Sequence, residues 1–186
     1  MIYIGADNGI SGSWGFVSEY GTNQYSTPIK LDLNYQKTKV KHITRIDVVR
    51  LHELIWYELE EYWKKKFGNS ATYSINVNQI IQEVRCMIER PMVNPMRFEA
   101  TTSALRALEA TLITLERVRI GYEYVDSKAW QKVLLPVVNK EQYSKDKQIY
   151  KKLSLEVGQR MFPHIEFDKD ADGILIASYC QLRYKD

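Results

Sequence analysis

Residues 2–17 read IYIGADNGISGSWGFV: an apolar run reaches an aspartate, a glycine-rich turn follows, and a second apolar run returns. Asn-Gly between apolar runs is a strong hairpin signal, so Asp7-Asn8-Gly9 is predicted to be a turn between two strands. Aspartate is depleted in strands and is rarely buried without a partner. Asp7 is therefore either only a turn former or also a ligand of a cation. The second interpretation requires other carboxylates elsewhere in the chain.

Composition predicts a single soluble α/β domain that spans residues 1–186. Of the 186 residues, 45% are hydrophobic and 26% are charged, which is the balance of a globular protein with a sizeable core. The sequence has neither an apolar stretch long enough to cross a membrane nor a basic leader, so we expect a cytoplasmic protein. His42, His52 and His164 are scattered, which argues against a histidine-based metal site or triad.

Charge is unevenly distributed along the chain. The net charge is only +3, and residues 1–89 carry 10 Lys/Arg against 10 Asp/Glu, whereas residues 128–160 carry 8 Lys/Arg against 3 acids. A local basic surface is what a polyanion such as DNA would need. By itself, however, a solvated lysine-rich helix face explains this segment better.

Strands alternate with helices along the sequence, which predicts an α/β sheet covered on its faces. After the hairpin, STPIKLDLN is a third candidate strand, with Pro28 at its start or on a sheet edge. The apolar spacing then predicts helices over 44–66, with Thr44 as N-cap, and over 97–119. Further elements are expected in this order: a strand-like segment ending on Glu89 before the second helix, a strand over 122–125, a short helix around Trp130, a basic helix over 144–163 and an apolar helix at the end of the chain.

Acidic residues stand at the ends of these elements. Asp7 and Glu89 each end a strand-like segment, and Asp168, Asp170 and Asp172 lead into the last helix. Strand ends and helix N-termini gather at one edge of an open α/β sheet, where binding sites form. Each acid alone is better explained as a turn former or cap. Three acids at matching element ends instead favour a site for a hard divalent cation such as Mg²⁺, because carboxylate oxygens are its preferred ligands.

Three segments in order, IGADNGISG, IERPMVNPMRFEATTSALRALEATL and DADGILIASY, resemble the acidic motifs of RuvC-type Holliday junction resolvases, and most closely their bacteriophage-encoded branch. The first motif is weak alone, because sugar kinases and actin-like ATPases carry similar turns. The stretch over 88–136 is more specific. The resemblance covers nearly the whole chain. It implies an RNase H-like fold with a mixed central β-sheet flanked by helices, a homodimer, and endonuclease activity on branched DNA with two Mg²⁺ or Mn²⁺ ions, in the host cytoplasm if the protein is phage-encoded.

Carried over by position, the resemblance makes Asp7, Glu89 and Asp172 catalytic metal ligands. The fourth acid of the family usually lies three residues before the last one, where this chain has Lys169. Residues two apart on a helix do not share a face, so Asp170 can join the site only if the helix begins after it. Asp168 is the alternative, and Asp170 is preferred.

The resemblance also assigns DNA contacts. Lys151 and Lys152 are the first candidates for phosphate contacts, followed by Lys128 and Lys132. Arg97 and Phe98 follow the Glu89 segment and are candidates to approach a strand near the junction, where an aromatic ring can stack on an unpaired base. A core position is the plainer expectation for Phe98.

The resulting hypothesis is a structure-selective, metal-dependent DNA endonuclease that resolves four-way junctions by phosphodiester hydrolysis. One alternative keeps the fold but changes the substrate to forks, flaps or RNA–DNA hybrids. Another is a junction-binding protein without catalysis, favoured by Lys169. An ATP-binding protein of the actin and sugar-kinase type would need a second phosphate-binding glycine turn, and none of the nine glycines forms one.

Overall fold

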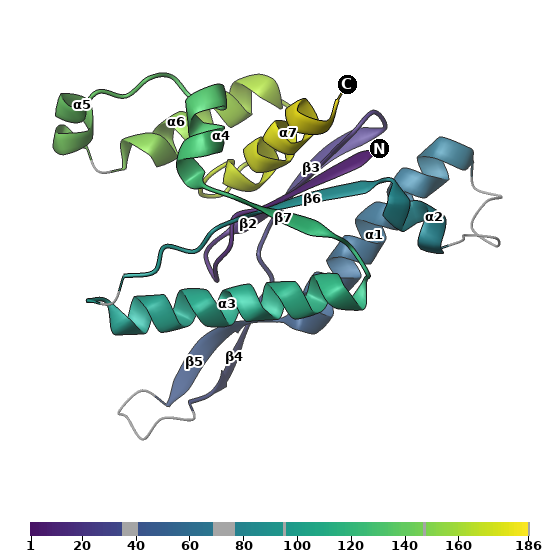
Figure 1. Cartoon of the computed structure of the whole chain (residues 1–186), viewed down its shortest axis with the longest axis horizontal. Coiled ribbons are helices and arrows are strands. Elements are labelled where there is room, and N and C mark those ends of the chain that lie inside the picture. The colour runs from purple at the N-terminus through teal and green to yellow at the C-terminus, as the bar shows by residue number, and fades with distance from the viewer. Residues whose placement is uncertain (35–40, 69–76, 95, 147, 186) are drawn as a thin grey trace.

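The computed structural model describes residues 1–34, 41–68, 77–94, 96–146 and 148–185. Its strands and helices alternate as predicted from residue 84 onward, whereas the strands over 21–26 and 42–46 and the helix over 77–82 were not predicted (Figure 1). The strands are β1 (Ile2–Ala6), β2 (Ser13–Ser18), β3 (Gly21–Ser26), β4 (Ile29–Leu33), β5 (His42–Ile46), β6 (Val84–Glu89) and β7 (Tyr122–Val125). The helices are α1 (Val48–Phe67), α2 (Val77–Gln82), α3 (Phe98–Arg117), α4 (Ser127–Leu134), α5 (Lys140–Lys145), α6 (Ile149–Met161) and α7 (Asp172–Tyr184).

Five strands form a mixed sheet in the order β3-β2-β1-β6-β7. The first three are antiparallel neighbours, because β1 and β2 form the predicted hairpin and β3 returns along β2. The turn of the β1–β2 hairpin lies later than predicted: the Gly12 N–H donates to the Gly9 carbonyl at 3.2 Å, so the turn spans residues 9–12 and not Asp7-Asn8-Gly9. β6 and β7 then add in parallel on the other side of β1. This mixed central sheet flanked by helices confirms the predicted α/β fold class.

Two apolar layers hold the helices on opposite faces of the sheet (Figure 1). On one face, Ile2 and Ile4 of β1 pack with residues of α1 and α3 such as Leu59 and Leu115. Tyr3, between them on the strand, points to the other face of the sheet and belongs to the core formed there with α4, α6 and α7. The two-residue period of the strand thus supplies both cores from one short segment.

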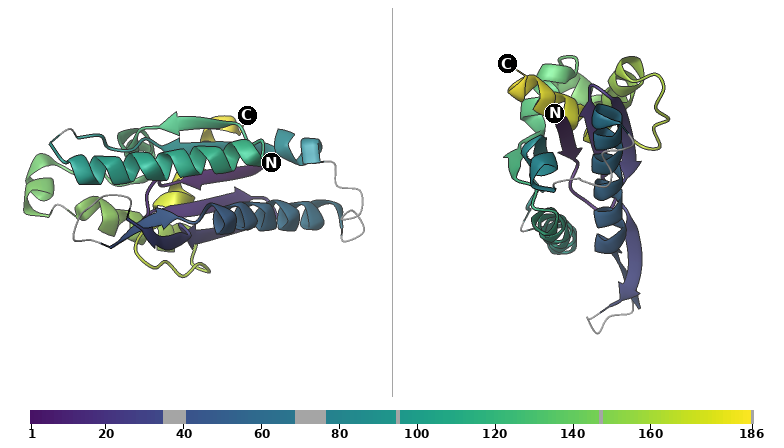
Figure 2. Two further views of the ribbon diagram at one scale, coloured as in Figure 1. Left: turned by 90° about the horizontal axis from the view of Figure 1, so that it is seen from below. Right: turned by 90° about the vertical axis from the view of Figure 1, so that its right-hand side faces the viewer.

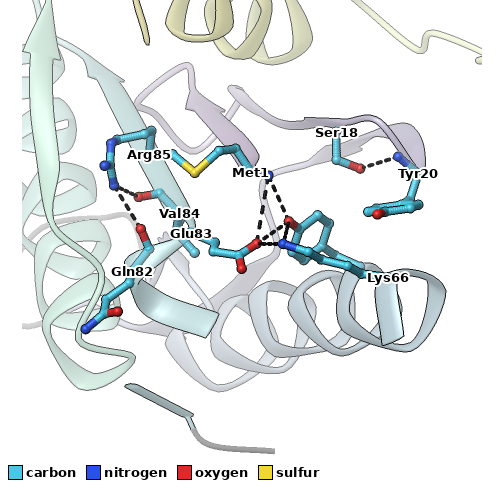
Figure 3. Close-up of polar contacts among 9 residues, drawn as sticks. Met1, Ser18, Tyr20, Lys66, Gln82, Glu83, Val84 and Arg85 are labelled. Atoms are coloured by element: carbon cyan, nitrogen blue, oxygen red, sulfur yellow. Dashed lines mark hydrogen bonds and ion pairs between the residues drawn. The ribbon is translucent and has the colours of Figure 1, made fainter. Parts of the chain in front are cut away.

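A polar cluster ties the start of β1 to α1 and to the residue before β6 (Figure 3). The Met1 amino group donates to the Tyr62 hydroxyl at 2.8 Å, and that hydroxyl donates to the Glu83 carboxylate. Lys66 pairs with the same Glu83 oxygen. Charge-assisted hydrogen bonds of this kind connect three separate segments at the sheet end opposite to the acidic residues.

The segment after β3 differs from the prediction. The expectation of a helix capped by Thr44 is wrong, because Thr44 lies in β5 and pairs with Leu31 of β4 in a separate two-stranded sheet. The helix begins at Val48, where the Asp47 side chain accepts the backbone N–H groups of Val49 and Arg50. The β-branched residues before Asp47 favour the extended form. Figure 2 shows this β4–β5 hairpin projecting away from the five-stranded sheet.

The predicted basic helix over 144–163 is shorter than expected, since α6 begins at Ile149. α5 ends before it at Lys145, and the carboxylate of its C-cap, Asp146, accepts the backbone N–H of Gln148. Within the described ranges, no helix has both the length and the apolar character that crossing a membrane requires.

Candidate metal centre

Strand register brings Asp7 and Glu89 to the same edge of the sheet. β1 and β6 are parallel, and Ala6 pairs with Ile88, so each acid is one residue beyond this pair on its own strand. The Asp7 N–H continues the hairpin ladder by donating to the Ser13 carbonyl at 2.9 Å. Two acids separated by more than eighty residues thus become neighbours through backbone pairing alone.

Asp172 reaches the same edge because α7 lies directly on β1 and β2. A Cβ atom added at Gly5 would lie 2.2 Å from the Ala177 nitrogen, and one added at Gly15 would lie 2.3 Å from the Ile174 Cα. Only glycine permits a helix backbone to approach two strands this closely. The first residue of α7, Asp172, is therefore held beside the end of β1.

Asp7, Asp170 and Asp172 form the cluster that we call the carboxylate triad. Each offers one carboxylate oxygen, and these oxygens all lie within 4.8 Å of one another. Asp170 is buried, whereas Asp7 and Asp172 are partly accessible. Oxygen atoms this close, from three acids and without soft ligands, are a donor set for a hard divalent cation.

Asp170 belongs to the triad because α7 begins after it. The N-cap of the helix is Ala171, so the spacing rule for helical faces does not apply to Asp170. The Asp170 carboxylate accepts the Ser13 hydroxyl at 3.2 Å and the Asp172 backbone N–H at 3.3 Å. Asp168 and Lys169, in contrast, are exposed. The geometry thus favours Asp170 over Asp168 as the third member of the cluster.

Ser13 of β2 and Gln24 of β3 form hydrogen bonds with the backbone around Asp170. Gln24 donates to the Asp170 carbonyl at 2.7 Å and accepts the backbone N–H of Ile174 at 2.9 Å. The Ser13 hydroxyl accepts the backbone N–H of Gly173 at 3.0 Å. Backbone N–H groups in the first turn of α7, which lack partners inside the helix, are thereby satisfied.

Burial, and after it the repulsion between neighbouring acids, raises the pKa values of the acids in the site. Burial, followed by the charges of Asp172, Glu89 and Asp170, raises the pKa of Asp7 well above its ordinary value. Burial and then the charge of Asp170 raise the pKa of Asp172 to about 6. Acids arranged in this way resist losing all their protons unless a cation compensates the charge.

Glu89 stands beside the carboxylate triad and is not one of its members. Its Oε2 accepts the indole N–H of Trp130 at 2.7 Å. Burial raises the pKa of Glu89 to about 7, the Trp130 hydrogen bond opposes this, and the charges of Asp172 and Asp170 add to the rise. The charges of the triad thus act on Glu89. Its hydrogen bond to Trp130 involves Oε2 and not Oε1.

The residues predicted to contact DNA are all exposed at the surface. Lys128 and Lys132 of α4 and Arg97, the N-cap of α3, are exposed. Lys152 pairs with Asp146 at 2.6 Å on the outside of α6. Phe98 is 70% exposed, which excludes the core role expected as the plainer alternative. Lys147 of the basic segment lies outside the described residues.

Lys151 differs from these residues because it points at the site. Its Nζ lies 3.5 Å from Asp170 Oδ2. On the same helix, the Ser154 hydroxyl donates to Asp172 Oδ1 and also accepts the backbone N–H of Ala171. α6 therefore forms a wall of the site.

Sequence reasoning missed the residues that support the acids: Ser13, Gln24, Trp130 as a hydrogen-bond donor, and Ser154. For the contact between β2 and α7, the sequence did contain an indication: Gly15, because an isolated glycine within a strand marks a close backbone approach. The serines and Gln24 carried none, since their partners are defined only by tertiary packing.

Comparison with known proteins finds similarity in structure only. No protein-family model matches the sequence, and no curated protein matches it. Thermus thermophilus RuvC in complex with Holliday junction substrate is similar over 95% of this chain and 90% of that chain, with 14% identity and a TM-score of 0.48. A second structure of Thermus thermophilus RuvC covers 100% and 97%, with 12% identity and a TM-score of 0.49. At these identities the similarity is one of fold.

Proposed function

We propose that the protein is a metal-dependent, structure-selective DNA endonuclease that cuts branched DNA. The observation that carries this proposal is the carboxylate triad, in which three oxygens from Asp7, Asp170 and Asp172 lie within 4.8 Å of one another at the edge of a mixed sheet. Glu89 ends the neighbouring parallel strand and extends the same acidic edge.

The residues present suit Mg²⁺ or Mn²⁺. The donors are carboxylate oxygens, which hard cations prefer over histidine and cysteine. The raised pKa values of Asp7 and Asp172 come in part from neighbouring acids, so a bound cation would relieve a repulsion already built into the fold. Asp7, Asp170 and Asp172 would hold the metal, with Glu89 as a further ligand. Divalent ions held there supply Lewis-acid activation of water and stabilisation of the departing oxygen in phosphodiester hydrolysis.

The choice of a four-way junction as substrate rests on the sequence resemblance to RuvC-type resolvases, and so does the homodimer. Exposed cations agree with a polyanionic partner: Lys128 and Lys132 on α4, the helix that carries Trp130, and Arg97 at the start of α3. Exposed Phe98 follows Arg97 directly and offers a surface on which a base can stack. Dimer symmetry would present two sites to opposed strands.

A junction-binding protein without catalysis is the second candidate. Two observations favour it: Lys169 stands at the position of the family's fourth acid, and Lys151 forms an ion pair with the triad member Asp170. Both place positive charge in or near a site that otherwise attracts metal.

The test is cleavage of a labelled synthetic four-way junction in Mg²⁺ and in Mn²⁺, beside a linear duplex, a fork, a flap and an RNA–DNA hybrid. Paired nicks confined to the junction, lost in both Asp7→Asn and Glu89→Gln while junction binding persists, would support the resolvase. Cleavage of the other branches or of the hybrid would instead identify a nuclease of the same fold. Junction binding without cleavage in either metal would support the non-catalytic protein. Full activity of Glu89→Gln in Mg²⁺ would refute the mechanism.

A further inference from the structure

The helix α6 presents one face to the acidic site. Lys151 and Ser154 are three residues apart on it and therefore neighbours on the helix surface. Lys151 contacts Asp170, and Ser154 contacts Asp172, so each meets a different member of the carboxylate triad. Lys152, one residue along, faces outward to Asp146. The position of Lys151 is thus set by the helix and is not shared by the neighbouring lysine.

The Lys151–Asp170 pair joins an accessible cation to a buried anion. The Lys151 side chain is 56% exposed, whereas that of Asp170 is 2% exposed. A buried carboxylate needs compensation by charge or hydrogen bonds, and among the described residues Lys151 is the only one that forms an ion pair with Asp170. The ammonium also acts on the rest of the triad, because its charge lowers the pKa of Asp7 and of Asp172 against the opposing effects of burial and neighbouring acids.

We propose that Lys151 is the built-in cation of this site, which limits the DNA-free protein to one divalent ion per chain. This inference rests on the proposed function and specifies its metal requirement. The Lys151 ammonium lies 3.5 Å from Asp170 Oδ2 and so stands on the side of the triad that a second ion would use. A second ion beside Asp170 would have to lie close to the ammonium, and like charges at such separations repel strongly in a partly buried site.

The exposed stem of Lys151 allows this restriction to be released. A long lysine side chain can swing between an interior carboxylate and a solvent-facing anion because its stem is flexible and its three donors rotate freely. A DNA phosphate that draws the ammonium outward would open the Asp170 side of the triad for a second ion. Binding of the second ion would then depend on bound DNA, so the DNA-free protein would hold one ion without being ready for cleavage.

The experiment counts Mn²⁺ bound to the DNA-free protein, by calorimetric titration and by electron paramagnetic resonance of the free ion. We expect one Mn²⁺ per chain for the wild type and two for Lys151→Gln, which removes the charge and keeps a polar side chain. Lys151→Arg retains the charge and should bind one. Lys152→Gln is the matched control, since it removes the same charge from the same helix without touching the triad, and it should also bind one.

The outcomes are separable from those of the nuclease test. Two ions on the wild type, or equal counts for Lys151→Gln and Lys152→Gln with both variants folded by circular dichroism, would overturn the inference. So would a wild type that binds no Mn²⁺. A change from one to two ions in Lys151→Gln, in a protein that cuts none of the DNA substrates, would support the role of Lys151 while the proposed nuclease function failed.

Discussion

The contact between α7 and the sheet makes a sharp prediction for Gly15→Ala. Gly15 lies in β2 under the first turn of α7, and a methyl group there would lie 2.3 Å from both the Cα and the nitrogen of Ile174. These are backbone atoms, so no side-chain rotation can relieve the overlap. The helix itself must move, and Asp172 moves with it.

The size of the movement follows from the distances. Ordinary contact of a Cβ atom begins at 3.4 Å, so α7 must rise by about 1 Å at this point. Inserting a methyl group into a packed interior typically costs about 1–3 kcal/mol, and here the upper part of that range applies because backbone must shift. A misplacement of about 1 Å in a reacting constellation costs on the order of 10²-fold in rate.

Urea unfolding measured with a constant m-value gives the stability change, and Mn²⁺ titration gives the effect on the site. Gly121→Ala is the matched control, because a Cβ atom at Gly121 has no atom within 4 Å outside its immediate neighbours. We expect Gly15→Ala to lose both stability and metal affinity and Gly121→Ala to retain both. A Gly15→Ala protein with wild-type stability and wild-type Mn²⁺ affinity would refute the argument that this glycine contact positions Asp172.

Two further predictions concern the acids of the site. In metal-free buffer, Asp172 with a pKa of about 6 and Glu89 with a pKa of about 7 hold protons in the folded state that they release in the unfolded state, so stability falls as pH rises from about 4 to 7 and then levels off. Between pH 5.5 and 8 the loss is on the order of 3 kcal/mol for the coupled pair. Thermal unfolding in EDTA at these two pH values measures it, and equal stability at both would contradict the burial of these charges. Trp130→Phe removes a hydrogen bond that favours the ionised form of Glu89, so its pKa should rise and the levelling-off should move above pH 7. An unchanged pH profile in a folded variant would show that the indole does not act on Glu89.

Local patterns predicted much of the fold. The hairpin after β1 is present as predicted, although its turn spans residues 9–12 and is displaced from Asn8-Gly9, and β7 has the predicted bounds. The start of α1 did not follow, because the choice between strand and helix over residues 42–46 is made by pairing with β4, which a helical period cannot reveal. Secondary structure that depends on a distant partner is where the local signals failed.

The acids of the candidate site were accessible to sequence reasoning because strand ends and helix starts meet at one edge of such a sheet. Their support was not accessible. Ser154 reaches Asp172 across the α6–α7 connection, and Trp130 reaches Glu89 from the helix after β7. These contacts require that two elements pack at a particular rotation, and residue type alone does not encode that.

The role of Asp170 shows how finely such a site depends on one helix boundary. With helical backbone beginning one turn earlier, Asp170 and Asp172 would point in different directions, and only Asp172 could meet Asp7. The helix begins instead at Asp172, where Ser13 and Gln24 of the hairpin strands satisfy its first N–H groups. Hydrogen bonds from a hairpin more than a hundred and forty residues earlier therefore decide which acids face one another. The same boundary leaves Asp170 within reach of Lys151, so the helix start that completes the carboxylate triad also brings it a cation.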